Sequence, residues 1–143
     1  MDRVASGLEI IHRGGYCLGN MPRLYIYEKC DTCRQALKFL AAQGVKAEVI
    51  PIREQPPTQA ELRRMLVFMG GGLRKLFNTS GLDYKALGMK DRLPKMKEAE
   101  AIELLSQNGN LVKRPFLLTK DNGTVGFKEE TWRNLLLNAK GRP

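Results

Sequence analysis

The stretch LYIYEKCDTCRQALKFLAAQG, residues 24–44, decides the fold of this 143-residue chain. Its first four residues are apolar or aromatic and predict a short buried strand over residues 24–27. A helix is expected over residues 32–43, with Gly44 as its end. Its predicted buried face consists of Cys33, Ala36, Leu37, Leu40 and Ala41. Residues 46–52 predict a second strand, so the three elements imply a right-handed parallel crossover.

The middle of the chain predicts helices without strands, and the sheet pattern returns near its end. Thr58 and Glu61 form a predicted capping box at the start of a helix. The apolar stripe of that helix consists of Leu62, Met65, Leu66 and Met69. Residues 116–119 and 124–127 predict a hairpin, and residues 129–138 a closing helix. This order predicts an α/β fold, a thioredoxin-like β-α-β / β-β-α core with a central all-helical insertion over about residues 58–110.

Residues 1–20 predict an N-terminal extension, and residues 21–143 one thioredoxin-like domain. The extension has poor periodicity and contains Cys17 and His12. It lacks a continuous apolar stretch followed by a small-residue cleavage site, so no signal peptide is expected. The longest apolar runs of the chain are only a few residues, which predicts no membrane span and a cytoplasmic protein.

The formal net charge of +9 indicates anionic partners without naming them. No run of consecutive basic residues exceeds two, and the aromatic residues do not alternate with a basic stripe. Direct nucleic-acid binding is therefore not expected. An anionic substrate, an acidic protein partner and a generally basic surface all remain open.

Cys30 and Cys33 carry the strongest chemical signal. Three cysteines are too few for a disulfide framework, and these two lie at a predicted strand-to-helix transition. With Cys30 at the helix N-terminus, the helix dipole favours its thiolate, and Arg34 adds positive charge. A half zinc site would need ligands from Cys17 or His12 at unusual spacing, and inert core cysteines are the other alternative. Redox chemistry is the favoured interpretation, and no metal is expected.

Pro115 is a second candidate for the site. Prolines that open this strand in thioredoxin folds are commonly cis and pack against the cysteine pair, which predicts a cis Pro115. Arg114 would then lie beside Cys30 and could bind an oxyanion through its two-pronged guanidinium. The alternative is an exposed arginine before an edge proline. Residues 78–81, Asn-Thr-Ser-Gly, could end a helix or line the pocket.

Residues 22–138 resemble the arsenate reductase/Spx family, which contains glutaredoxin-type arsenate reductases and Spx-like regulators. The motifs are Cys30-x-x-Cys33-Arg34, Pro56-Pro57-Thr58, Asn78-Thr79-Ser80-Gly81 with Tyr84, Lys113-Arg114-Pro115 and Gly126-Phe127-Lys128. The resemblance implies a nucleophilic Cys30 and an oxyanion site in which Arg114 matches one of three arginines. Asn78 and Lys128 stand at the other two positions, and neither reproduces the bidentate grip of arginine. Cys33 stands where these reductases have serine.

The resemblance implies two functions. The first is a thiol-disulfide oxidoreductase with Cys30 as attacking and Cys33 as resolving thiol, and with Arg34, Asn78 and Lys128 as anion-binding residues. It would bind no cofactor, with glutathione as a possible electron donor and the glutaredoxin or thioredoxin system as partner. The alternative is a Spx-like regulator, in which the pair is a disulfide switch and the partner is the C-terminal domain of the RNA polymerase α subunit.

Overall fold

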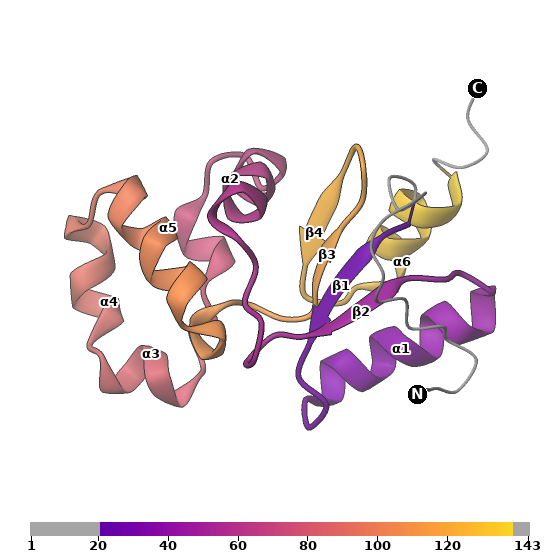
Figure 1. Cartoon of the computed structure of the whole chain (residues 1–143), viewed down its shortest axis with the longest axis horizontal. Coiled ribbons are helices and arrows are strands. Elements are labelled where there is room, and N and C mark those ends of the chain that lie inside the picture. Colours follow the sequence, from indigo (N-terminus) through magenta and orange to yellow (C-terminus); the bar gives the residue numbers. More distant parts are fainter. Residues whose placement is uncertain (1–20, 139–143) are drawn as a thin grey trace.

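A computed structural model describes residues 21–138, which form a four-stranded mixed sheet with helices on both faces (Figure 1). The strands are β1 (Arg23–Ile26), β2 (Glu48–Pro51), β3 (Phe116–Leu118) and β4 (Gly123–Val125), in the order β2-β1-β3-β4. The pairs β1–β2, β1–β3 and β3–β4 are parallel, antiparallel and antiparallel. The predicted thioredoxin-like core is therefore confirmed. The predicted N-terminal extension lies outside the described residues.

One face of the sheet is covered by α1 (Asp31–Gln43) and α6 (Glu129–Arg133), which continues as the π-helical η5 (Asn134–Asn138). The helix α1 ends at Gly44, whose φ of 66° is the left-handed conformation that glycine adopts easily. Its buried face contains Phe39, which packs against the rings of Phe127 and Trp132. Ala41 is exposed, so its predicted burial was wrong. The aromatic cluster places Phe39 in the interface instead.

The other face carries the helical insertion, drawn on the left of Figure 1. It contains α2 (Gln59–Phe68), η2 (Leu73–Leu76), α3 (Leu82–Ala86), α4 (Met89–Arg92), η3 (Leu93–Lys95), α5 (Glu98–Gln107) and η4 (Gly109–Leu111). Between β2 and β3, the only strand-like pairing in the described chain is an isolated bridge between Phe77 and Val112. The prediction of helices without strands in this part is confirmed.

The sheet separates two apolar cores, because alternate residues of a strand point to opposite faces. In β1, Leu24 and Ile26 belong to the cluster formed with α1 and α6, whereas Tyr25 belongs to the cluster formed with the insertion. In β3, Leu117 and Phe116 divide between the clusters in the same way. Both faces of the sheet are therefore buried.

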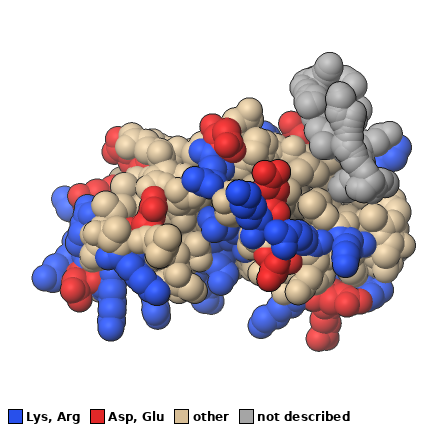
Figure 2. Space-filling model, turned by 90° about the horizontal axis from the view of Figure 1, so that it is seen from below, with Lys and Arg blue, Asp and Glu red and all other residues tan. Residues whose placement is uncertain are grey.

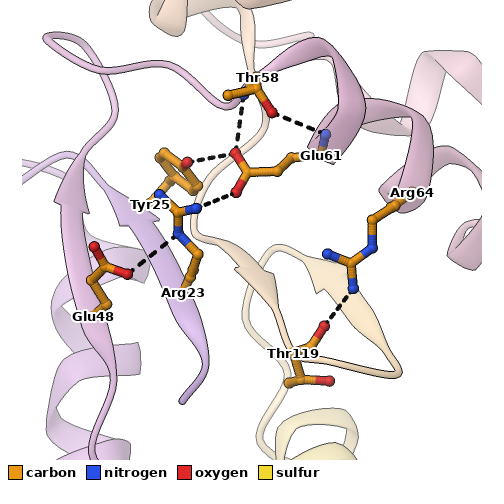
Figure 3. Close-up of polar contacts among 7 residues, drawn as sticks. All are labelled: Arg23, Tyr25, Glu48, Thr58, Glu61, Arg64 and Thr119. Atoms are coloured by element: carbon orange, nitrogen blue, oxygen red, sulfur yellow. Dashed lines mark hydrogen bonds and ion pairs between the residues drawn. The ribbon is translucent and has the colours of Figure 1, made fainter. Parts of the chain in front are cut away.

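A buried carboxylate joins the insertion to β1 (Figure 3). Glu61 is 7% exposed and accepts hydrogen bonds from the Tyr25 hydroxyl at 2.6 Å and the Thr58 backbone N–H at 3.0 Å. The Thr58 hydroxyl accepts from the Glu61 backbone N–H, which completes the predicted capping box. Arg23 pairs with Glu61 at 2.9 Å and supplies the opposite charge. Because a buried carboxylate is costly when unpaired, these contacts hold α2 against β1.

Arg64 holds the same helix to the hairpin. It donates hydrogen bonds to the backbone carbonyls of Thr119, at 2.7 Å (Figure 3), and Lys120, at 3.0 Å. The insertion is thus fastened to β1 on one side and to the β3–β4 turn on the other.

None of the helices formed by residues 21–138 is long and apolar enough to cross a membrane.

Replacing Tyr25 with Phe tests the buried carboxylate. The variant loses a hydrogen bond to a charged group, so we expect it to unfold more easily by about 1–3 kcal/mol. Burial raises the pKa of Tyr25, and the hydrogen bond and charge of Glu61 raise it further. The hydroxyl stabilises the fold fully below the ordinary phenol pKa of 10.0 and progressively less as the pH rises above it. Urea denaturation across this range should therefore show the gap between wild type and Tyr25→Phe closing at alkaline pH. A gap independent of pH would contradict this account.

Gly109→Ala tests the contact between η4 and the end of β2. A Cβ atom at Gly109 would overlap the carbonyl oxygen of Ile52 and lie 2.7 Å from its carbonyl carbon. Since backbone must move, we expect a loss of about 2 kcal/mol or more in the free energy of unfolding. Gly72→Ala is the control, because the added methyl group meets only the flexible side chain of Lys75. Equal denaturation midpoints for the two variants would refute the close approach.

Candidate functional site

The candidate site lies where the strands end. The parallel strands β1 and β2 finish at the same edge of the sheet, and the antiparallel β3 begins there. Cys30 follows β1 after a tight turn, in which its backbone N–H donates to the Tyr27 carbonyl at 3.0 Å. It is the N-cap of α1, as predicted, with φ −97° and ψ 123°. The chain thus presents Cys30 at a helix N-terminus beside the ends of three strands.

Cys30 is the more acidic of the two thiols. Partial burial raises its pKa, but hydrogen bonds from the Cys33 backbone N–H, the Cys33 thiol, the Thr32 hydroxyl and the Arg114 guanidinium outweigh this effect. The net result is a pKa below the ordinary thiol value of 9.0. Because the thiolate is the nucleophilic form, Cys30 is prepared to attack an electrophile.

Cys33 has the opposite character. It is fully buried in the cluster under α1, and its sulfur accepts a hydrogen bond from the Tyr27 backbone N–H at 3.5 Å. Burial raises its pKa, the hydrogen bond from Tyr27 and the charge of Arg114 oppose this, and the hydrogen bond and charge of Cys30 add to it, so that the net pKa is about 12. One thiol of the pair is therefore held as a proton donor to the other.

Arg114 lies beside Cys30, and its peptide bond to Pro115 is cis, as the sequence predicts. Its guanidinium stacks on the Tyr27 ring at 5.1 Å from the ring centre. Its Nη1 atom is buried and has no hydrogen-bond partner among the described residues. Arg114 thus stabilises the Cys30 thiolate and keeps a donor available.

Arg34 has other partners than the thiolate. Its Nη1 pairs with Asp31 at 2.6 Å, and its Nε donates to the Glu28 carbonyl at 3.2 Å. These contacts hold the Arg34 side chain along the first turn of α1, and more than half of the side chain is exposed. Its role as an anion-binding residue stays a prediction.

Lys128 and Arg114 line one pocket of about 390 Å³. Its other lining residues are Thr32, Lys113, Thr124, Val125, Gly126, Phe127 and Thr131. The lining includes three cations and no carboxylate. Gly126 shapes one wall with a φ of 81°, and its carbonyl accepts from the indole Nε1 of Trp132 at 3.0 Å. The pocket therefore offers an anion a cationic lining beside the first turn of α1.

The structure does not bring Asn78 into this pocket. Its backbone N–H donates to the Leu111 carbonyl at 2.8 Å, and its amide lies over Gly81. The antiparallel pairing there also joins Lys113 to Leu76, so Asn78 lies at the end remote from Arg114. Asn78 lies in the turn after η2, whose C-cap is Phe77, and its role in anion binding stays a prediction.

Within residues 21–138, no cluster of three His, Cys, Asp or Glu side chains has the arrangement of a metal site. The two sequence candidates for additional zinc ligands, Cys17 and His12, lie outside the described residues.

The ArsC family model matches residues 25–135. The chain belongs to the ArsC family. It is 45% identical over 106 residues to the Bacillus subtilis protein YusI, covering 74% of this chain and 90% of that protein. It is 28% identical over 116 residues to the global transcriptional regulator Spx of Streptococcus agalactiae, covering 81% of this chain and 83% of Spx. An arsenate reductase from Escherichia coli is 29% identical over 101 residues, covering 69% of this chain and 70% of that enzyme.

A solved structure of an ArsC family related protein from Bacteroides fragilis has the same fold. It is 38% identical and superposes with a TM-score of 0.77, covering 82% of this chain and 98% of that one. The ArsC-family membership that the motifs suggested is confirmed.

Sequence reasoning missed three residues near the cysteine pair: Tyr27, Lys113, and Arg53, whose guanidinium carbon lies 4.8 Å from the centre of the Tyr27 ring. Tyr27 was assigned only to a strand, and Lys113 only to a motif. Arg53 directly follows the second predicted strand. The predicted parallel crossover puts the ends of both strands at one edge, where α/β sheets bind ligands, and this signal could have identified Arg53.

Arg114→Met and Arg34→Met separate the two arginines nearest to Cys30 in the motifs. Removing the Arg114 guanidinium should raise the pKa of Cys30 and slow its alkylation at neutral pH. The Arg34 substitution should leave both unchanged, because its charge is paired with Asp31. The measurement is the pH dependence of iodoacetamide alkylation at Cys30, in a Cys17→Ser background. Identical profiles for wild type and Arg114→Met would contradict the assigned contact.

Proposed function

We propose that this ArsC-family chain is a thiol-disulfide oxidoreductase, with Cys30 as the attacking thiolate and Cys33 as the resolving thiol. One observation carries the proposal: Cys30 is the half-buried N-cap of α1 and Cys33 lies fully buried in the first turn of the same helix, and the pKa of Cys30 is lowered whereas that of Cys33 is raised. This division separates a nucleophile from a reserve thiol.

The reaction has two exchange steps. The Cys30 thiolate attacks one sulfur of a substrate disulfide, which forms a mixed disulfide on Cys30 and releases the other half as a thiolate. Cys33 then loses its proton to solvent and attacks the Cys30 sulfur, which forms the Cys30–Cys33 disulfide and releases the second half as a thiolate. The substrate gains two electrons and the pair loses two. An external thiol, such as glutathione or a dithiol of the glutaredoxin or thioredoxin type, returns them.

The same contacts order the steps. The charge of Cys30 and its hydrogen bond raise the pKa of Cys33. Both contributions end when Cys30 becomes part of a mixed disulfide, whereas the charge of Arg114 still lowers the pKa of Cys33. Cys33 therefore becomes a better nucleophile only after the first step is complete.

The pocket supports an anionic disulfide as substrate. Lys113, Arg114 and Lys128 line it, and the carboxylates of a peptide disulfide match these cations. Arsenate is the less favoured substrate, because the pocket has one arginine and two lysines. Lysine is a point charge and lacks the planar fork that grips an oxyanion at two points.

A Spx-like regulator is the second candidate, supported by the 28% identity to Spx over 116 residues. In this function the pair would form its disulfide once on oxidation and alter binding to the C-terminal domain of the RNA polymerase α subunit. Such a switch needs the same two thiols but no substrate pocket, so the cationic pocket favours the enzyme.

Cys30→Ser and Cys33→Ser distinguish the two thiols, both in a Cys17→Ser background. With glutathione disulfide as substrate and a thioredoxin system as reductant, Cys30→Ser should lose turnover to the uncatalysed rate. Cys33→Ser should accumulate a mixed disulfide on Cys30, visible as a glutathione adduct by mass spectrometry. Cys17→Ser alone is the control and should keep full turnover.

Unchanged turnover in Cys30→Ser would remove Cys30 from the mechanism. No turnover in any variant, together with binding of the polymerase α domain that changes on oxidation of the pair, would establish the regulator instead.

A further inference from the structure

The ring of Tyr27 contacts the guanidinium groups of two arginines. The guanidinium carbon of Arg114 lies 5.1 Å from the centre of its ring, and that of Arg53 lies 4.8 Å from the same point. Two like charges approach one ring here, and each is attracted to its π electrons. The ring follows β1 and is connected to the site, because its backbone contacts both Cys30 and Cys33.

The strand order separates the two arginines. Arg53 follows β2, Tyr27 follows β1 and Arg114 precedes β3, so the sheet order β2-β1-β3 places them in a row. Lys113 and Lys128 line the pocket on the β3–β4 side. Cys30 follows the end of β1. Arg53 therefore puts a positive charge on the β2 side of that strand end, opposite to the side of Lys113 and Lys128. Figure 2, which shows the molecule from below, has basic side chains across the centre of the surface, with acidic side chains among them.

Arg53 keeps its hydrogen-bond donors available. It is exposed, and among the described residues no carboxylate forms an ion pair with it. By contrast, Arg23, Arg34 and Arg133 are each paired with an acidic side chain. Glu28 and Glu54 line a neighbouring pocket with Tyr27, and neither is ion-paired with Arg53. Stacking without pairing leaves the planar fork of Arg53 available for a ligand.

We propose that Arg53 is a substrate-binding residue that holds an anionic group of one half of the disulfide on the β2 side of Cys30. Lys113 and Lys128 hold the anionic group of the other half. The inference rests on the proposed function and specifies its substrate class: a small disulfide with an anionic group on each half. Tyr27 is the positioning residue, because it supports Arg53 and Arg114 on either side of the thiolate.

The first test needs no turnover. Iodoacetate and iodoacetamide alkylate the same thiolate and differ in the charge of the reagent, so the ratio of their rates at Cys30 reports the positive charge nearby. In the Cys17→Ser background, Arg53→Met should lower this ratio up to about fivefold, the size of one exposed ion pair. Arg53→Lys should keep most of it. Arg63→Met is the matched control, because this exposed arginine bonds, within residues 21–138, only to Gln59 one turn earlier on α2.

The second test uses turnover. Arg53→Met should raise KM for glutathione disulfide and leave kcat/KM for uncharged hydroxyethyl disulfide unchanged, a selectivity that a merely structural role would not produce. The difference should vanish near 1 M salt, where the screening length is about 3 Å. The pKa of Cys30 should not move in this variant.

If Arg53→Met has the same ratio of iodoacetate to iodoacetamide rates as the Cys17→Ser protein, the inference is overturned, even if the proposed function holds. A lowered ratio without turnover of any disulfide would uphold the anion site and overturn the disulfide as its ligand.

Discussion

The central strand β1 buries side chains on both of its faces, and the rest of the structure depends on this constraint. Leu24 and Ile26 need one apolar layer, and Tyr25 needs another. The helices α1 and α6 supply the first layer and the insertion supplies the second. The insertion is therefore part of the core of this protein, because without it one face of the sheet would be exposed to water.

The insertion is also held by polar contacts, and these are placed where the apolar interface ends. Glu61 is fixed by Tyr25 and Arg23 from β1 and by its own helix cap. Removing one partner would leave a buried carboxylate with fewer compensating contacts, so an insertion docked in another position would be penalised. Gly109 fixes the opposite end of the insertion by close contact with the backbone at Ile52. The insertion thus contacts β1 through Glu61 and the end of β2 through Gly109.

The chemistry of the site follows from a difference in burial between two nearby thiols. Cys30 at the helix N-terminus receives hydrogen bonds and the charge of Arg114, whereas Cys33 one turn later lies inside the core. The two positions account for this difference, because Cys30 is the N-cap of α1 and Cys33 lies in its first turn, among the residues that α1 buries in the core. The cations around the pair are an arginine and two lysines in one pocket and a further arginine across Tyr27. This distribution suits separated carboxylates better than one compact oxyanion.

Much of this protein could be predicted from its sequence alone. Short apolar runs, the Thr58–Glu61 capping box and Gly44 are local signals, and each predicted an element that the described residues contain. The Cys30–Cys33 spacing predicted Cys30 at a helix N-terminus, where it lies, and the redox chemistry of the pair stays a prediction. Tertiary structure decided the rest. Arg34 is adjacent to the motif in sequence yet pairs with Asp31, and Asn78 lies in the turn after η2 and does not line the pocket. Phe39 is buried against aromatic rings, whereas Ala41 is exposed. Arg53, 23 positions beyond Cys30, lies against the Tyr27 ring, because parallel strands end at one edge. Local sequence determines which residues can form a helix or a reactive thiol, but the packing of distant segments determines which charges surround that thiol.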